Sequence, residues 1–270
     1  MINGDIKPEF VDCDFRTFPE FVAGDVRPDN MAELCAAMES YEDSGPMIDK
    51  SQWQTIADYI AKSMGGIMYL IYMILNQSRE GSCVGNATTQ GVMIVLAKQF
   101  GKAAATALSA ISLYKRIGRS ASSGAMVSDA LDEVKARGIL PLDTPANRAK
   151  FGNHVMPPTG FSTPFPSGWE ETAKQFKIDE YLVVRTYEGL ISALLSGFPV
   201  IVGRDGHSIC YCGVIFKDGK IYVIYVNSWG NWGMAAGEMT TGFGMDSERT
   251  IRQSASWAFA IRSVVVPAAA

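Results

Sequence analysis

The stretch from Asn76 to Cys83 limits what this chain can fold into more than any other part of its sequence. It reads Asn-Gln-Ser-Arg-Glu-Gly-Ser-Cys, and a helical pattern of small and apolar residues follows it as far as Gly101. A cysteine at the start of a helix lies beside unpaired backbone N–H groups at the positive end of the helix dipole, which favours the reactive thiolate. The pattern therefore predicts a nucleophilic Cys83, if the rest of the chain supplies a base and a group that orients the base.

A base and its orienting group are predicted near the C-terminal end. Two apolar strands flank Asp218-Gly219, a pair that suits a tight type I′ hairpin turn. His207 opens the first strand and Asn227 follows the second, so the hairpin should make them neighbours. An asparagine carbonyl that accepts a proton from one imidazole nitrogen fixes the ring and leaves the other nitrogen for the thiol. Trp229 is placed to shield that hydrogen bond from water.

Together these motifs resemble those of the papain-like cysteine peptidases. The matching motifs occur in the family's order: Gln77 with Gly81-Ser82-Cys83, Gly206-His207 at a strand entrance, Asn227-Ser228-Trp229-Gly230, and Trp232-Gly233. A weaker match runs from Gly124 to Gly138-Ile139 and is similar to the family's substrate-binding glycine loop and the helix after it. The resemblance covers about residues 76–265, and we expect Gly124 and Trp229 to contact substrate.

The resemblance also implies a role for each central residue. Cys83 is the expected nucleophile, His207 the general base and then the general acid, and Asn227 the residue that orients His207. The side-chain amide of Gln77 and the backbone N–H of Cys83 are the expected oxyanion hole. The implied reaction is hydrolysis of peptide bonds in a protein or peptide substrate, through a thioester and without a metal or organic cofactor.

Two positions depart from the family pattern. Val84 stands where a tryptophan usually follows the nucleophile, and Glu80 stands where the family often has a disulfide cysteine. The five cysteines, at positions 13, 35, 83, 210 and 212, show no metal-ligand spacing. We therefore expect a chain without disulfides, in a reducing compartment.

Helical patterns come first along the chain and strand patterns later, which predicts an α+β fold in two lobes. Residues 1–75 form an expected N-terminal extension, consisting of an arm to about residue 28 and two helices. Residues 76–270 form the expected peptidase domain, with a helical lobe at about 76–140 and a β lobe at about 160–270. The predicted helices are 28–41, 51–64, 83–100, 103–117, 126–137 and 187–195, a proline-rich connection covers 141–169, and the predicted strands are 181–184, 199–202, 208–216, 220–226 and 257–265.

Charge and hydropathy exclude several function classes. The chain of 270 residues has a net charge of −4 and no basic cluster, which argues against a nucleic-acid partner. Its longest apolar run, residues 67–75, is far shorter than the roughly 20 residues that span a bilayer as a helix. The N-terminus lacks the basic segment and apolar core of a secretory signal. We expect a cytoplasmic or virion-associated protein.

Two other functions fit the same sequence. One is a catalytically silent papain-fold subunit of a larger assembly, such as a phage virion, which docks through aromatic residues of the N-terminal arm (Phe10, Phe15, Phe18 and Phe21). The other is acyl transfer of the amidase or transglutaminase kind by the same triad. The N-terminal extension could likewise inhibit the site, dock to a partner, or belong to the core.

Overall fold

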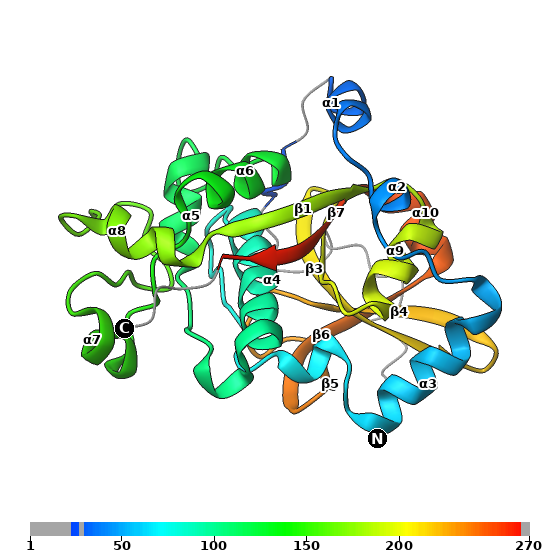
Figure 1. Cartoon of the computed structure of the whole chain (residues 1–270). Helices are drawn as coiled ribbons and strands as arrows, with labels where there is room; N and C mark the ends of the chain where they lie inside the picture. Colours follow the sequence, from blue (N-terminus) through cyan, green and yellow to red (C-terminus); the bar gives the residue numbers. More distant parts are fainter. Residues whose placement is uncertain (1–22, 27–29, 266–270) are drawn as a thin grey trace.

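The computed structural model describes residues 23–26 and 30–265 (Figure 1). Over this part of the chain the fold is α+β, as predicted. Helices α4 to α8 gather on one side, and a seven-stranded antiparallel sheet with its own helices forms the other. The strand order is β1-β7-β2-β3-β4-β6-β5. The predicted aromatic arm lies almost wholly outside the described residues.

The helices are α1 (Met31–Ala37), α2 (Tyr41–Ser44), α3 (Trp53–Ser63), α4 (Cys83–Phe100), α5 (Ala110–Ile117), α6 (Val127–Arg137), α7 (Pro145–Phe151), α8 (Trp169–Ala173), α9 (Tyr187–Leu195) and α10 (Glu248–Ser254). The strands are β1 (Ile178–Val184), β2 (Val200–Arg204), β3 (His207–Lys217), β4 (Lys220–Val226), β5 (Met234–Ala236), β6 (Met239–Ser247) and β7 (Ala255–Val264). No helix in this described part is both long and apolar enough to span a membrane.

Helix α4 lies at the centre, between the helices α5 to α8 and the sheet (Figure 1). Its residues from Cys83 to Ala97 are all buried, including the polar Asn86, Thr88, Thr89 and Gln90, which is typical of a helix that is enclosed on every side. Gly91 allows α4 to lie close to the sheet, because a β-carbon at this position would lie 2.8 Å from Cδ1 of Ile201 and 2.9 Å from Cδ1 of Ile261. Helix α4 therefore packs closely against β2 and β7.

The predicted hairpin is present as β3 and β4. Asp218 and Gly219 at its turn have φ angles of 51° and 71°, the positive values that a type I′ turn requires. Strand β3 opens with His207 and β4 ends one residue before Asn227. The turn chemistry thus brings both residues to the same end of the hairpin.

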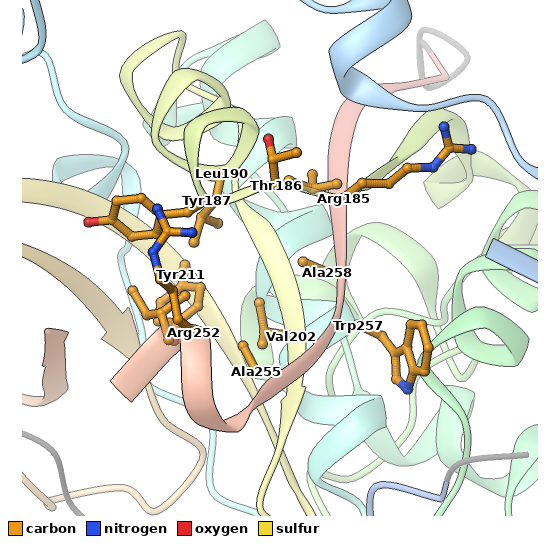
Figure 2. A pocket seen from close by; sticks show the side chains of 12 residues that line it. Arg185, Thr186, Tyr187, Leu190, Val202, Tyr211, Arg252, Ala255, Trp257 and Ala258 are labelled. Carbon is orange, nitrogen blue, oxygen red and sulfur yellow. The ribbon is translucent and has the colours of Figure 1, made fainter. Parts of the chain in front are cut away.

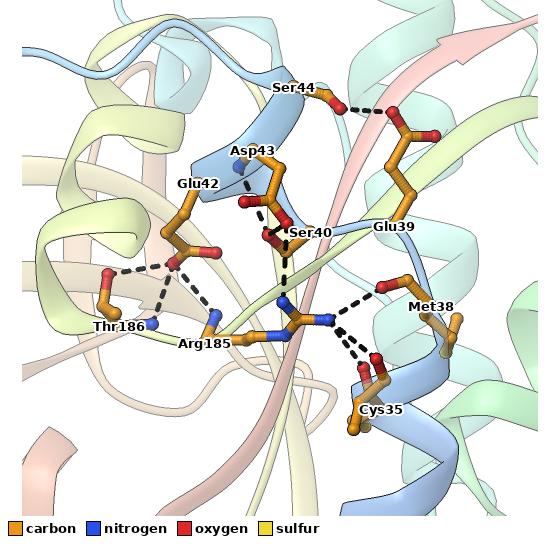
Figure 3. A network of polar contacts seen from close by, with 10 residues as sticks. Cys35, Met38, Glu39, Ser40, Glu42, Asp43, Ser44, Arg185 and Thr186 are labelled. Atoms are coloured by element: carbon orange, nitrogen blue, oxygen red, sulfur yellow. Dashed lines mark hydrogen bonds and ion pairs between the residues drawn. The ribbon is translucent and has the colours of Figure 1, made fainter.

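Residues 30–75 pack on the sheet side and hold part of the core. Tyr41 and Trp53 are 0% and 1% exposed. Figure 3 shows polar contacts between this region and the β lobe. Arg185 donates to the carbonyl oxygens of Cys35 and Met38, at 3.2 and 2.8 Å. The Glu42 carboxylate accepts from the backbone N–H groups that join β1 to α9. These contacts tie α1 and α2 to the β lobe.

Several predicted boundaries were wrong for identifiable reasons. The helix predicted at 103–117 begins only at Ala110, because Leu108 forms a β-bridge with Pro141. Helix α7 was missed inside the proline-rich connection, although Thr144 caps it and Pro145 occupies its first turn, where a missing N–H costs nothing. Strands β5 and β6 and helix α10 were also missed. The apolar run at 67–75 begins as a 3₁₀ turn, Ile67–Leu70.

Replacing Trp53 with alanine should show that residues 30–75 belong to the folded core. Its indole Nε1 donates to the Ile48 carbonyl at 2.9 Å and its ring meets Tyr187 edge to face, with centroids 6.2 Å apart. Trp53→Ala should lower the free energy of unfolding by about 3–5 kcal/mol, measured by urea denaturation. Tyr59→Ala, at a side chain 71% exposed on the same helix, is the control and should change it little. If both substitutions changed the free energy of unfolding equally little, α3 would not be part of the core that stabilises the fold.

Candidate active site

Cys83 begins helix α4, with Ser82 as its N-cap residue, so the thiol stands at the positive end of the helix as predicted. Backbone hydrogen bonds from Ser208, Val84 and Cys83 itself reach the sulfur and favour the thiolate. Two stronger effects oppose them. Burial raises the pKa of the Cys83 thiol to about 12, and the nearby Asp25 carboxylate adds to the rise. In this conformation the thiol is protonated at neutral pH.

His207 and Asn227 are in contact, as the hairpin predicted. Nε2 of His207 lies 2.8 Å from Oδ1 of Asn227, which directs Nδ1 to the other side of the ring. The Trp229 ring lies on the imidazole, with centroids 5.0 Å apart and planes 32° apart. His207 and Asn227 are 0% and 2% exposed, so their hydrogen bond is buried beside this ring and away from water. A contact between Trp229 and substrate stays a prediction.

The environment of His207 favours the neutral imidazole. Burial lowers the pKa of His207 to about 4, the Asn227 hydrogen bond opposes this change, and the Arg204 charge adds to it. Arg204 faces His207 across β2 and β3 and is ion-paired with buried Asp246. Tyr211 donates to the same Asp246 carboxylate at 2.6 Å. A buried cation on β2, an anion on β6 and a phenol on β3 itself are thus linked beside His207.

Gln77 is fully buried and its side-chain amide is held at both ends. Its Oε1 accepts from the Ser228 hydroxyl at 2.6 Å, and its Nε2 donates to the Glu80 carbonyl oxygen at 2.9 Å. The backbone N–H of Gln77 also donates to the Ser228 carbonyl at 2.8 Å, beside a β-bridge between Asn76 and Trp229. The Gln77 loop is therefore fastened to the segment that follows Asn227.

Residues 23–26 cross the site as a short extended segment, a placement that sequence reasoning missed. The backbone N–H of Val26 donates to the Ala125 carbonyl, and the N–H of Ala125 donates to the Gly24 carbonyl, both at 2.8 Å. These bonds form a parallel β-bridge, and Gly24 also donates to the Gly206 carbonyl at 2.9 Å. The segment thus joins the Gly124 loop of the helical side to the entrance of β3.

Gly24 lies directly against the Cys83 sulfur. A β-carbon at this position would be 2.6 Å from the Cys83 sulfur and 2.5 Å from the Gly81 carbonyl oxygen. Gly124 lies on the other side of the segment with a φ of 69°, and a β-carbon there would be 2.6 Å from the Gly24 oxygen. Cys83 and Gly124 therefore contact the same short segment, and a contact between Gly124 and substrate stays a prediction.

A cavity of about 270 Å³ lies away from these residues (Figure 2). It sits between α9, α10 and strands β2 and β7, and its lining includes Tyr187, Leu190, Val202, Ile251 and Trp257. It contains none of the predicted site residues. Within residues 23–26 and 30–265, no group of three or more His, Cys, Asp or Glu side chains could hold a metal ion.

Comparison with known proteins identifies the architecture. No protein-family model and no curated protein sequence matches this chain. Xylellain, a cysteine protease from Xylella fastidiosa, matches with a TM-score of 0.59 and 18% identity over 90% of this chain and 97% of its own. A digestive procathepsin L2 proteinase from the larval midgut of Tenebrio molitor matches with a TM-score of 0.62 and 15% identity over 93% and 81%.

The fold is papain-like. Identities this low show the fold alone, so the chemistry of this chain has to be argued from its own residues. In this papain-like fold the Cys83 sulfur accepts a hydrogen bond from the backbone of Ser208, the residue after His207. His207 contacts Asn227, and Gln77 is bonded to Ser228, the residue after Asn227. A thiol, an oriented imidazole and a fixed amide donor are the groups that acyl transfer through a thioester requires.

The low pKa of His207 should be visible by NMR, because the chain has only two histidines. One imidazole should titrate near pH 4, and His207→Asn should remove that signal. Between pH 6.5 and about 4 the unfolded chain binds a proton at this position that the folded chain excludes. Stability should therefore fall as the pH falls through this window, and less so in His207→Asn. Two imidazoles that both titrate near pH 6.5 would contradict this burial.

Proposed function

We propose that this chain is a cysteine peptidase that hydrolyses peptide bonds through a thioester, with Cys83 as nucleophile. The observation that carries the proposal is the 2.8 Å contact between His207 and Asn227, beside a thiol at the N-terminus of a buried helix. A papain-like fold supports it, since the chain's solved neighbours include cysteine proteases.

In the proposed reaction, Nδ1 of His207 takes the proton from the Cys83 thiol while Asn227 holds Nε2. The thiolate attacks the substrate carbonyl, and the resulting oxyanion is stabilised by the Cys83 backbone N–H and by Gln77. Nε2 of Gln77 carries two hydrogens, and only one is needed for the bond to Glu80. His207 then protonates the leaving amine, and water releases the acid from the thioester with His207 as the base.

The same structure supports a latent form of this enzyme, in which residues 23–26 block the site. Gly24 leaves no room for a substrate carbon beside the Cys83 sulfur. The carbonyl oxygen of Gly24 accepts from Ala125, so it is turned toward that backbone and not toward Gln77 or the Cys83 N–H. The Gly24–Asp25 peptide bond is therefore not presented for attack, and the segment blocks without being a substrate.

Asp25 adds an electrostatic effect to the steric one. Its carboxylate lies against Gly203, where there is no room for a β-carbon, and it raises the pKa of the Cys83 thiol in addition to burial. Removing the segment would expose the sulfur and take away a negative charge. Both changes favour the thiolate.

A second candidate, the catalytically silent subunit, is favoured by the complete burial of Cys83. The two candidates differ in what happens when the segment is displaced. A latent enzyme gains a reactive thiol, whereas a silent subunit only exposes an inert one.

An epoxysuccinyl thiol probe, followed by peptide mapping, tests the catalytic proposal. In a chain carrying Gly24→Val the adduct should form on Cys83 alone, and adding His207→Ala should lower its rate by about a hundredfold or more, the range for loss of an activating base. Cys35, Cys210 and Cys212 are buried internal controls. Equal labelling with and without His207 would favour the silent subunit.

Gly24→Val and Asp25→Asn separate the steric and electrostatic parts of the block. Overpacking costs about 1–3 kcal/mol, so Gly24→Val should speed labelling of Cys83 by about tenfold or more relative to the unaltered chain. Asp25→Asn keeps the shape and removes the charge, so it should shift the pH–rate profile of labelling to lower pH. Glu33→Gln, on exposed α1, is the control for charge. Labelling that is as fast in the unaltered chain as in Gly24→Val would mean that the segment does not block the site.

A further inference from the structure

The Glu80 carboxylate joins two stretches that are distant in sequence. Its Oε1 accepts from the backbone N–H groups of Gly160 and Phe161, at 3.0 and 2.9 Å. Hydrogen bonds to an ionised acceptor are about twice as strong as bonds between neutral groups. Nothing in the local sequence pattern pairs the loop before Cys83 with the proline-rich connection.

The partner of Glu80 is itself anchored. The Phe161 ring meets Tyr114 of α5 edge to face, with centroids 5.5 Å apart. Nζ of Lys115, also on α5, donates to the Phe161 carbonyl and lies over its ring. The two amides that Glu80 binds are therefore fixed to a buried helix, and the carboxylate has a rigid point of attachment.

The backbone of Glu80 contacts Gln77, the predicted oxyanion donor. Its carbonyl oxygen accepts from Nε2 of Gln77 at 2.9 Å, and its N–H donates to the Gln77 carbonyl at 3.2 Å. With Ser228 donating to Oε1, a flipped amide would put the Gln77 oxygen against the Glu80 oxygen. The position of the Glu80 peptide thus decides where the second Nε2 hydrogen points.

The rest of the loop provides one other anchor for this peptide. Gly81 donates to the Ala121 carbonyl at 2.7 Å on the side toward Cys83. On the other side Ser78 has a φ of 53° and Arg79 is exposed. Among the contacts of residues 23–26 and 30–265, Gly81 would be the one hydrogen-bonded attachment left between the loop from Gln77 to Gly81 and the helical side if the Glu80 carboxylate were removed.

We propose that Glu80 is a positioning residue for the oxyanion hole, which acts by clamping its own peptide, and through it Gln77, to the Gly160–Phe161 backbone. The inference rests on the proposed peptidase function. It differs from a merely structural role, since its loss should impair the step that forms an oxyanion and leave the thiol's nucleophilicity intact.

The test compares two reactions of the same thiol in the full chain, with Gly24→Val added if the unaltered chain is too slow to measure. Hydrolysis of a peptide ester forms an oxyanion, whereas alkylation of Cys83 by iodoacetamide does not. Losing one oxyanion donor costs about 10²–10³-fold, so Glu80→Ala, which only displaces the donor, should lower kcat for the ester by about 10–100-fold. KM and the alkylation rate should stay within about twofold.

Two matched variants complete the design. In Glu80→Gln an amide oxygen can accept both N–H bonds, so this variant should restore kcat to within about fivefold, given that the charge-assisted part is lost. Glu170→Ala, at an exposed carboxylate in α8, should leave kcat unchanged. Hydrogen exchange of the Gly160 and Phe161 amides should be faster in Glu80→Ala alone.

Three results would overturn the proposal: an unchanged kcat in Glu80→Ala, an equal fall in ester hydrolysis and alkylation, or a Glu80→Gln variant as impaired as Glu80→Ala. A parent chain that alkylates normally but hydrolyses no ester would count against the proposed function itself. In that case faster amide exchange in Glu80→Ala would show a clamp with a structural role only.

Discussion

The candidate site depends on the packing of α4 between the sheet and the helices α5 to α8. Gly91 leaves room for the Ile201 and Ile261 side chains of β2 and β7 against the helix, and every residue from Cys83 to Ala97 is buried. Because the helix cannot tilt without opening that interface, the packing fixes the position of the Cys83 sulfur relative to β3, the strand that carries His207. The geometry of acyl transfer tolerates little displacement, so a packed interface is a suitable way to set it.

The parts of the site that follow from local chemistry could be predicted from sequence. The helix at Cys83 has its cap and its apolar pattern, and Asp218-Gly219 is a turn whose geometry brings His207 beside Asn227. The α+β fold class could be predicted for the same reason. Even where the elements were right, their ends shifted where a long-range bridge took over, as between Leu108 and Pro141.

The remaining features arise from contacts between distant stretches, on which local pattern carries no information. The position of Gly24 against the thiol depends on its backbone hydrogen bonds to Ala125 and Gly206. The two hydrogen bonds that the Glu80 carboxylate accepts depend on a loop about 80 positions away. The same holds for the burial that raises the pKa of Cys83, since a cysteine at a helix start should have a lowered pKa when it stands alone. Sequence suggests the chemistry, and tertiary packing decides whether the thiol is in a reactive state.

The loop before Cys83 is secured without a covalent link. The four cysteines in the described part of the chain are free, and at the position where papain-like peptidases often have a disulfide cysteine, this chain has the carboxylate of Glu80 on two amides. A disulfide exists only where the ambient thiol–disulfide couple allows it and needs an oxidant to form. Hydrogen bonds form as soon as the chain folds. The shape of this loop is therefore independent of redox potential, and the chain can assemble its site without an oxidase or a disulfide isomerase.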